Sequence, residues 1–122
     1  MNQREAQQEW AHWKYYVMAR SQAEYLSLRQ LFSGNQWDEE KEKSFVASLQ
    51  RIQQLPANPK AMRNAYEHVW GYFKKQATSD ERATFYQKLT AISETQDEAL
   101  AYLRYLNKKY PNQYLADSKL FT

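Results

Sequence analysis

Recurrent signals for helix starts constrain the fold of this chain more than any other feature of its sequence. Residues 21–24, 78–81 and 95–98 each match a capping box, which begins with Ser or Thr and ends with Glu. In such a box the hydroxyl oxygen accepts from the third helical amide, and the Glu side chain accepts from the amide of the capping residue. Each start is followed by apolar residues at helical spacing. The pattern predicts an all-α protein.

Two further caps complete a set of about six helices. Asp38 precedes an acidic turn, and Asn58 precedes Pro59, a residue favoured at the first helical position. The expected helices cover about residues 4–20, 22–32, 39–54 and 60–76, followed by a fifth carrying Phe85, Leu89 and Ile92 and a sixth carrying Leu103, Leu106 and Tyr110. Residues 112–122 are expected to form a tail held to the body by Tyr114, Leu115, Leu120 and Phe121. Short loops predict a compact bundle or an orthogonal array.

Composition narrows the class of protein further. A length of 122 residues predicts one domain spanning residues 1–122, and only two glycines disfavour a β fold rich in hairpins. The absence of cysteine excludes disulfides, iron–sulfur ligation and a cysteine nucleophile within this chain. No apolar run resembles a signal peptide or a membrane span, so we expect a cytoplasmic protein. We expect no cofactor.

One helix carries an unusual polar row. Between residues 60 and 76, Asn64, His68 and Tyr72 recur every four residues, with Lys74 near the helix end. The row lies beside the apolar stripe of that helix, so core packing does not require these residues. Together they offer hydrogen-bond donors, acceptors and a charge, which suit a small anionic or heteroaromatic ligand. Gly71 within this helix indicates either a close helix crossing or a ligand approaching the backbone.

Catalytic and metal motifs are absent from the sequence. His12 and His68 fall on different expected helices, so they form no local metal pair, and no metal site is expected. No serine lies in a nucleophile-elbow context. Whether the chain is an enzyme therefore stays open. The formal charge of +3 and the pI near 9.0 are mildly basic and favour contact with anions without indicating a nucleic-acid-binding stripe.

Three blocks of sequence carry a family resemblance. These are K-x-x-x-M-A-R-S-Q-x-E-Y at residues 14–25, N-A-Y-E-H-V-W-G-Y-F-K at residues 64–74, and Y-L-x-x-L-x-x-x-Y-P-x-x-Y-L at residues 102–115. Their order resembles the bacterial YbgA-like family, a domain of unknown function, over about residues 12–121. Residues 93–99 depart from the family pattern, which usually has a basic, glycine-containing turn there, so a ligand contact made by that turn is not expected in this chain.

The resemblance implies an accessory role. Some members are joined to a cysteine-bearing domain similar to iron–sulfur-dependent desulfidases, which act on thiolated nucleobases. The present chain has no cysteine and so lacks that chemistry. The resemblance implies a desulfidase-like protein as a partner, and the polar row favours a small anionic ligand. The matching positions that we expect to contact it are Lys14, Arg20, Ser21, Tyr25, Asn64, His68, Gly71, Tyr72 and Lys74.

These observations leave several functions open. The leading hypothesis is a helical accessory or binding domain in which these residues form one pocket for an anionic or nucleobase-like ligand, or a docking surface for a desulfidase-type partner. An enzyme using His68 as acid or base is a second reading. A weak nucleic-acid-binding protein is a third, for which binding should weaken steeply with salt. A homodimer formed through exposed aromatic side chains is a fourth, and no membrane contact is expected.

Overall fold

All regular structure in the described part of the chain, residues 1–34 and 36–122 of a computed structural model, is helical. The helices are α1 (Gln3–Met18), α2 (Gln22–Leu31), α3 (Glu39–Gln53), α4 (Pro59–Trp70), α5 (Ser79–Thr90), α6 (Ala99–Lys109) and α7 (Gln113–Ala116). The predicted all-α class is confirmed. Six of these helices correspond to the expected ones, and the short α7 adds a turn of helix to the segment expected to be a tail.

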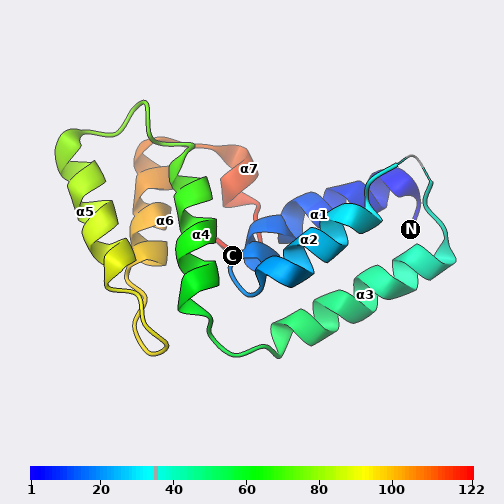
Figure 1. Ribbon diagram of the computed structural model, residues 1–122. Helices are drawn as coiled ribbons and strands as arrows, with labels where there is room; N and C mark the ends of the chain where they lie inside the picture. The colour runs from blue at the N-terminus through cyan, green and yellow to red at the C-terminus, as the bar shows by residue number, and fades with distance from the viewer. Residues whose placement is uncertain (35) are drawn as a thin grey trace.

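The helices form two groups whose axes run in different directions (Figure 1). Helices α1, α2 and α3 lie against one another, and α4, α5 and α6 do the same beside them. The two groups meet chiefly where α1 contacts α4, and α7 lies near this junction (Figure 1). A face of α4 therefore borders the end of α1 and the start of α2. Asn64 and His68 of the expected polar row lie on this face.

Each group encloses a hydrophobic cluster. The cluster of α1–α3 is centred on Val17, Leu28, Phe45, Leu49 and Ile52. The cluster of α4–α7 is larger, and it also takes in side chains from the end of α1 and from the C-terminal segment. Residues of the expected stripes are buried in it, including Phe85, Leu89, Ile92, Leu103 and Leu106.

The fourth helix ends earlier than expected. It stops at Trp70, where Gly71 is the C-cap, and residues 71–76 continue as tight turns. The amide of Tyr72 donates to the Val69 carbonyl at 3.0 Å, a bond across three residues that tightens the backbone. Glycine is a poor former of helix interiors, which accounts for the earlier end. Among the described residues, a Cβ at position 71 would lie 3.1 Å from the carbonyl oxygen of His68 and within 4 Å of no side chain from another helix, so the close-crossing explanation is wrong.

Two of the three predicted capping boxes are formed only in part or not at all. Thr78 and Glu81 make the complete box at α5. Ser21 caps α2 by accepting from the Glu24 amide at 3.1 Å, but the Glu24 carboxylate instead pairs with Arg51 at 2.6 Å. At α6 no bond comes from the Thr95 side chain to the helix.

Asp97 caps the start of α6 in place of Thr95. Its Oδ1 accepts from the amides of Ala99 and Leu100 at 3.0 and 3.2 Å. The helix accordingly begins at Ala99, and residues 93–98 form an irregular connection before it. Thr95 is instead part of a local turn, in which its amide donates to Ser93 Oγ at 3.3 Å.

The C-terminal segment is tied to α1 by polar bonds as well as by apolar contacts. Leu115 and Leu120 are buried, in agreement with the expectation for this segment, and Asn112 caps α7. His12 Nδ1 lies 2.6 Å from the Asp117 carbonyl oxygen, and the Lys119 amide donates to the His12 carbonyl at 2.8 Å. His12 therefore has a structural role. No helix in the described residues is long and apolar enough to cross a membrane.

Candidate functional site

Four of the expected site residues line one hollow between α1, α2 and α4, which we call the α1–α2–α4 groove. Its volume is about 280 Å³, and it contains Lys14, Tyr25, Asn64 and His68. The other residues that line it are Tyr15, Met18, Gln22, Leu26 and Arg29. The structure thus brings together side chains that are about 50 residues apart in the sequence.

Helical spacing explains why these residues share the groove. Lys14 and Met18 are four residues apart on α1, and Asn64 and His68 are four apart on α4, so each pair projects from one face of its helix. On α2 the contributing positions are residues 22, 25, 26 and 29, which also follow one helical face. The groove is formed by three such faces, which packing into the two clusters leaves at the surface.

A second hollow adjoins the groove at the start of α4. It measures about 420 Å³ and is lined by Gln22, Asn58, Lys60, Ala61 and Asn64. Gln22 and Asn64 line both hollows, and Asn64 Nδ2 donates to Gln22 Oε1 at 3.1 Å. This hydrogen-bonded amide pair is therefore common to the walls of both hollows.

The charge of the two hollows is entirely positive. Lys14 and Arg29 line the groove and Lys60 lines the adjoining hollow, whereas neither hollow is lined by an Asp or Glu. Within the described residues no carboxylate lies within 4.0 Å of these three cations. The nearest acidic residue of α2 in sequence, Glu24, is paired with Arg51. No negatively charged side chain among the lining residues would repel an anion in either hollow.

Tyrosines form the inner wall of the groove. Tyr15 is 6% exposed, and its hydroxyl lies 2.9 Å from the hydroxyl of Tyr72. Burial, together with the hydrogen bond to Tyr72, raises the pKa of Tyr15 above its usual value. The Tyr15 phenol therefore stays neutral, and the groove gains no negative charge from it. Tyr72 does not line the groove and reaches it only through Tyr15.

The remaining expected residues lie elsewhere. Ser21 caps α2, and both Ser21 and Arg20 line a separate hollow beside Leu55. Arg20 Nη1 donates to the Leu55 carbonyl at 3.2 Å. Lys74 is exposed in the turns after α4 and lines none of the hollows described here. The single pocket expected from the sequence thus contains Lys14, Tyr25, Asn64 and His68 but not Arg20, Ser21, Gly71, Tyr72 and Lys74.

A family model described as "Protein of unknown function (DUF1722)" matches residues 14–122. The chain belongs to the DUF1722 family. The YbgA-like family that the sequence resembles is a DUF1722 family, so that resemblance is confirmed. Neither a curated protein nor a solved structure matches the chain.

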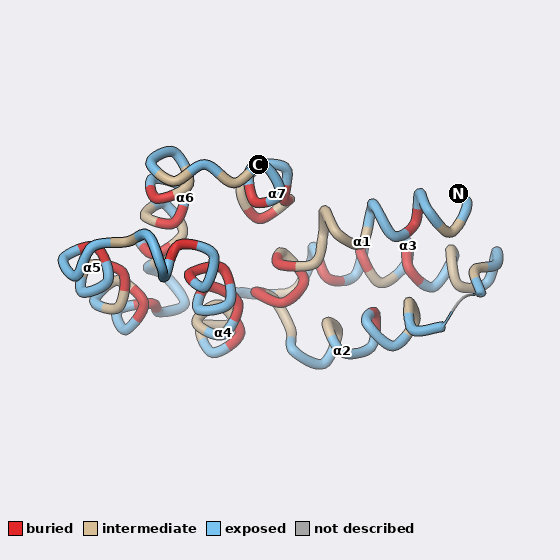
Figure 2. Tube along the Cα trace, turned by 90° about the horizontal axis from the view of Figure 1, so that it is seen from above, coloured by how far each residue is buried: buried red, intermediate tan, exposed pale blue. Residues whose placement is uncertain are grey.

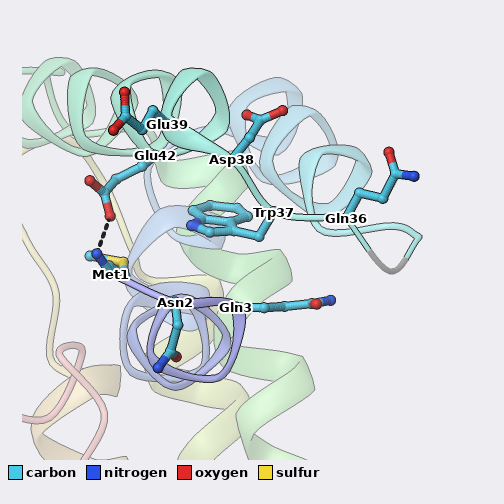
Figure 3. A pocket seen from close by; sticks show the side chains of 8 residues that line it. All are labelled: Met1, Asn2, Gln3, Gln36, Trp37, Asp38, Glu39 and Glu42. Carbon is cyan, nitrogen blue, oxygen red and sulfur yellow. Dashed lines mark ion pairs between the residues drawn. The ribbon is translucent and has the colours of Figure 1, made fainter.

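The DUF1722 match includes every residue that lines the groove but not every residue that lines a larger cavity. That cavity, of about 760 Å³, lies between the start of α1 and the segment that leads into α3 (Figure 3). It is lined by Asp38, Glu39 and Glu42, and by Met1, Asn2 and Gln3, which precede the matched residues. The α1–α2–α4 groove lies wholly within the DUF1722 match and is positive instead of acidic.

Sequence reasoning missed part of the groove in this DUF1722 protein. Gln22 and Arg29 in the groove, and Lys60 in the adjoining hollow, were not among the expected site residues, because each resembles an ordinary surface residue of a helix. The helical spacing of α2 was the available signal, since it places residues 22, 26 and 29 on the same face as the expected site residue Tyr25. In the described residues no group of three or more His, Cys, Asp or Glu side chains is placed to hold a metal ion.

Proposed function

We propose that this DUF1722 domain binds a small phosphate-bearing, nucleobase-like ligand in the α1–α2–α4 groove. The observation that carries the proposal is the set of three cations, Lys14, Arg29 and Lys60, around two adjoining hollows that no carboxylate lines. Lys and Arg hold phosphate through charge-assisted hydrogen bonds. Tyr25 supplies an aromatic surface, and Asn64 and His68 supply donors and acceptors that suit the edge of a base.

An accessory role follows from this chemistry and from the family resemblance. Some related domains are joined to a cysteine-bearing domain similar to desulfidases that act on thiolated nucleobases, and the present chain has no cysteine of its own. Such a domain would hold the substrate while a desulfidase-type partner carries out the reaction. The groove is the surface at which the ligand would be presented to that partner.

Binding of uridine monophosphate and 4-thiouridine monophosphate tests the proposal directly. Titration calorimetry should detect both nucleotides and should show uridine, which lacks the phosphate, binding about tenfold more weakly. Lys14→Gln should weaken nucleotide binding by about tenfold. Lys108→Gln is the matched control, because Lys108 is an exposed lysine in the last turn of α6 and lines neither hollow.

The methionines report where the nucleotide binds. Met18 lines the groove and Met62 does not, so methyl NMR of the protein should show a shift at Met18 on addition of nucleotide. Equal affinity for uridine and its monophosphate, or a shift confined to Met62, would refute the proposal.

A nucleic-acid strand is a second candidate, favoured by the adjoining hollows. Cations on both sides of the Gln22–Asn64 pair allow successive phosphates of one strand to be held. A single-stranded oligonucleotide should then bind more tightly than the mononucleotide, and its affinity should fall steeply as salt rises. Equal affinities for oligonucleotide and mononucleotide would leave the small ligand as the better reading.

The enzymatic reading gains no such support. His68 is exposed, and no hydrogen bond in the described residues orients its ring. A general acid or base normally has a partner that fixes its tautomer and direction. We therefore propose a ligand contact for His68 and no proton transfer.

A further inference from the structure

A further cavity, distinct from the groove, lies where the two groups of helices meet, and we call it the junction cavity. Its volume is about 340 Å³. The end of α1, the segment before α4, α4 itself, the start of α6 and the C-terminal segment all contribute to its wall. It shares no lining residue with the α1–α2–α4 groove. A ligand in one site therefore does not occupy the other.

Arg20 is the one basic residue that lines the junction cavity, and its guanidinium group is held in place from two directions. Its Cζ lies 4.6 Å from the centre of the Tyr16 ring, and its Nη1 donates to the Leu55 carbonyl at 3.2 Å. A guanidinium group has five N–H donors, so this single bond leaves others for a ligand. Within the described residues no carboxylate lies within 4.0 Å of it.

The one acidic residue in the wall has its oxygens engaged. Asp97 Oδ1 accepts from the first amides of α6, and Asp97 Oδ2 accepts from the Tyr66 hydroxyl at 2.6 Å. The helix N-terminus and the phenol offset the charge of this carboxylate. Arg20 is thus the group in the wall that has hydrogen-bonding capacity for a charged ligand.

The rest of the wall is mainly apolar. Met62, Leu100 and Leu120 line it, and Ala19 and Ala57 add small side chains that leave space. Leu120 is 7% exposed and Ala19 is 5% exposed, so both belong to the packed interior. Such a cavity favours an apolar body, because burial of apolar surface is stabilising and a polar body would lose its bonds to water.

We propose that the junction cavity binds a small organic acid, with an apolar body against Met62 and Leu100 and its carboxylate on Arg20. Arginine matches a carboxylate with two parallel N–H donors, a geometry that lysine cannot offer. The size of the cavity lies at the lower end of the range for small-molecule sites. The sequence placed Arg20 with Lys14 and His68 in one pocket, whereas in the structure Arg20 lines the junction cavity and the hollow beside Leu55.

The experiment compares 3-phenylpropanoate with 3-phenylpropan-1-ol, which has the same apolar body without the charge. The acid should bind and should shift the methyl NMR signal of Met62 while leaving that of Met18, in the groove, unchanged. The alcohol should bind about tenfold more weakly, because it forms no charge-assisted pair with Arg20.

Substitutions separate a ligand contact of Arg20 from a purely structural role. Arg20→Gln should weaken binding of the acid about tenfold and leave binding of the alcohol unchanged. Arg82→Gln is the matched control, because Arg82 also lies over a tyrosine, Tyr86, at 5.5 Å but does not line the cavity. Ala57→Phe is a second test, because Ala57 is exposed in the segment before α4 and a larger side chain there blocks the cavity without disturbing the core.

Three results would overturn the proposal: equal affinity for acid and alcohol, no effect of Arg20→Gln on a folded protein, or unchanged binding in Ala57→Phe. If Arg20→Gln fails to fold, Ala57→Phe decides alone. Because nucleotide binding is read at Met18 and acid binding at Met62, failure here leaves the proposal for the groove intact, and the converse also holds.

Discussion

The α1–α3 group and the α4–α7 group solve the same packing problem in different ways. Buried residues cover the inner faces of α4, α5 and α6, whereas α1, α2 and α3 show more half-buried and exposed positions (Figure 2). The first group relies on aromatic side chains that are only partly covered, such as Trp10 and Phe32, whose ring centroids lie 5.7 Å apart. The second group has a deeper core and adds a buried carboxylate.

The difference in core depth explains which polar helix faces stay at the surface and are accessible to a ligand. The deep core of α4–α7 anchors α4, so the polar side of that helix needs no further packing partner. The shallower α1–α3 group leaves one face of α2 uncovered beside it. The groove forms at this boundary, because one wall is held by a deep core and the other wall is a helix with a spare face.

Truncation of one phenylalanine in each group provides the strongest test of the comparison. Phe85 is fully buried and stacks on Trp70, with ring centroids 4.9 Å apart, so Phe85→Ala should cost about 3–5 kcal/mol of unfolding free energy. Phe32 is half-buried, and Phe32→Ala should cost only about 1–2 kcal/mol. Urea unfolding measures both. Equal costs would mean that the two cores are equally deep.

The buried carboxylate of the second group predicts a smaller effect that depends on pH. Glu81 accepts from the Tyr110 hydroxyl at 2.6 Å, from Lys109 Nζ at 2.9 Å and from the Thr78 amide at 2.9 Å. These bonds to Tyr110, Lys109 and Thr78 lower the pKa of Glu81 from 4.5 to about 2.

Because the pKa of Glu81 is lower in the folded state, its contribution is fully present above pH 4.5 and is lost as the pH falls toward 2. Glu81→Gln should therefore lower the melting temperature at neutral pH and flatten its dependence on pH between 4.5 and 2. Melting curves of both proteins across this range measure the effect. A variant that keeps the full pH dependence would place the titrating group elsewhere.

Helix caps supply the smallest expected difference between the two groups. Thr78 belongs to a complete capping box, whereas Ser21 makes only one half of one. Ser21→Ala and Thr78→Ala should each cost about 1 kcal/mol, because each removes one hydroxyl oxygen that accepts from a helix amide. The reciprocal bond to the Glu81 carboxylate is donated by the Thr78 backbone amide and survives in Thr78→Ala. Urea unfolding compares the two variants. A clearly larger cost for Thr78→Ala would show that the two halves of the complete box reinforce each other.

The helices themselves were largely predictable from the sequence, because caps and apolar spacing act over a few residues. The starts at Ser21, Asp38, Asn58 and Thr78 are all formed. The start of α6 was misplaced, because Thr95 and Asp97 both offer capping oxygens and local pattern does not rank them. Asp97 caps α6 and also accepts a bond from Tyr66 on α4, a long-range contact that no local rule contains.

The sequence by itself determined the helical class, most helix starts and the placing of Asn64 and His68 on one face of α4, since these depend on neighbours within one or two turns. Only the tertiary structure decided which polar residues share a site. Lys14 joins Asn64 and His68 because α1 packs against α4, while Arg20 lies beyond the end of α1 and lines the junction cavity. Distances between residues on different helices depend on how the helices pack, through contacts between residues far apart in the chain. The spacing of residues along one helix does not predict these distances.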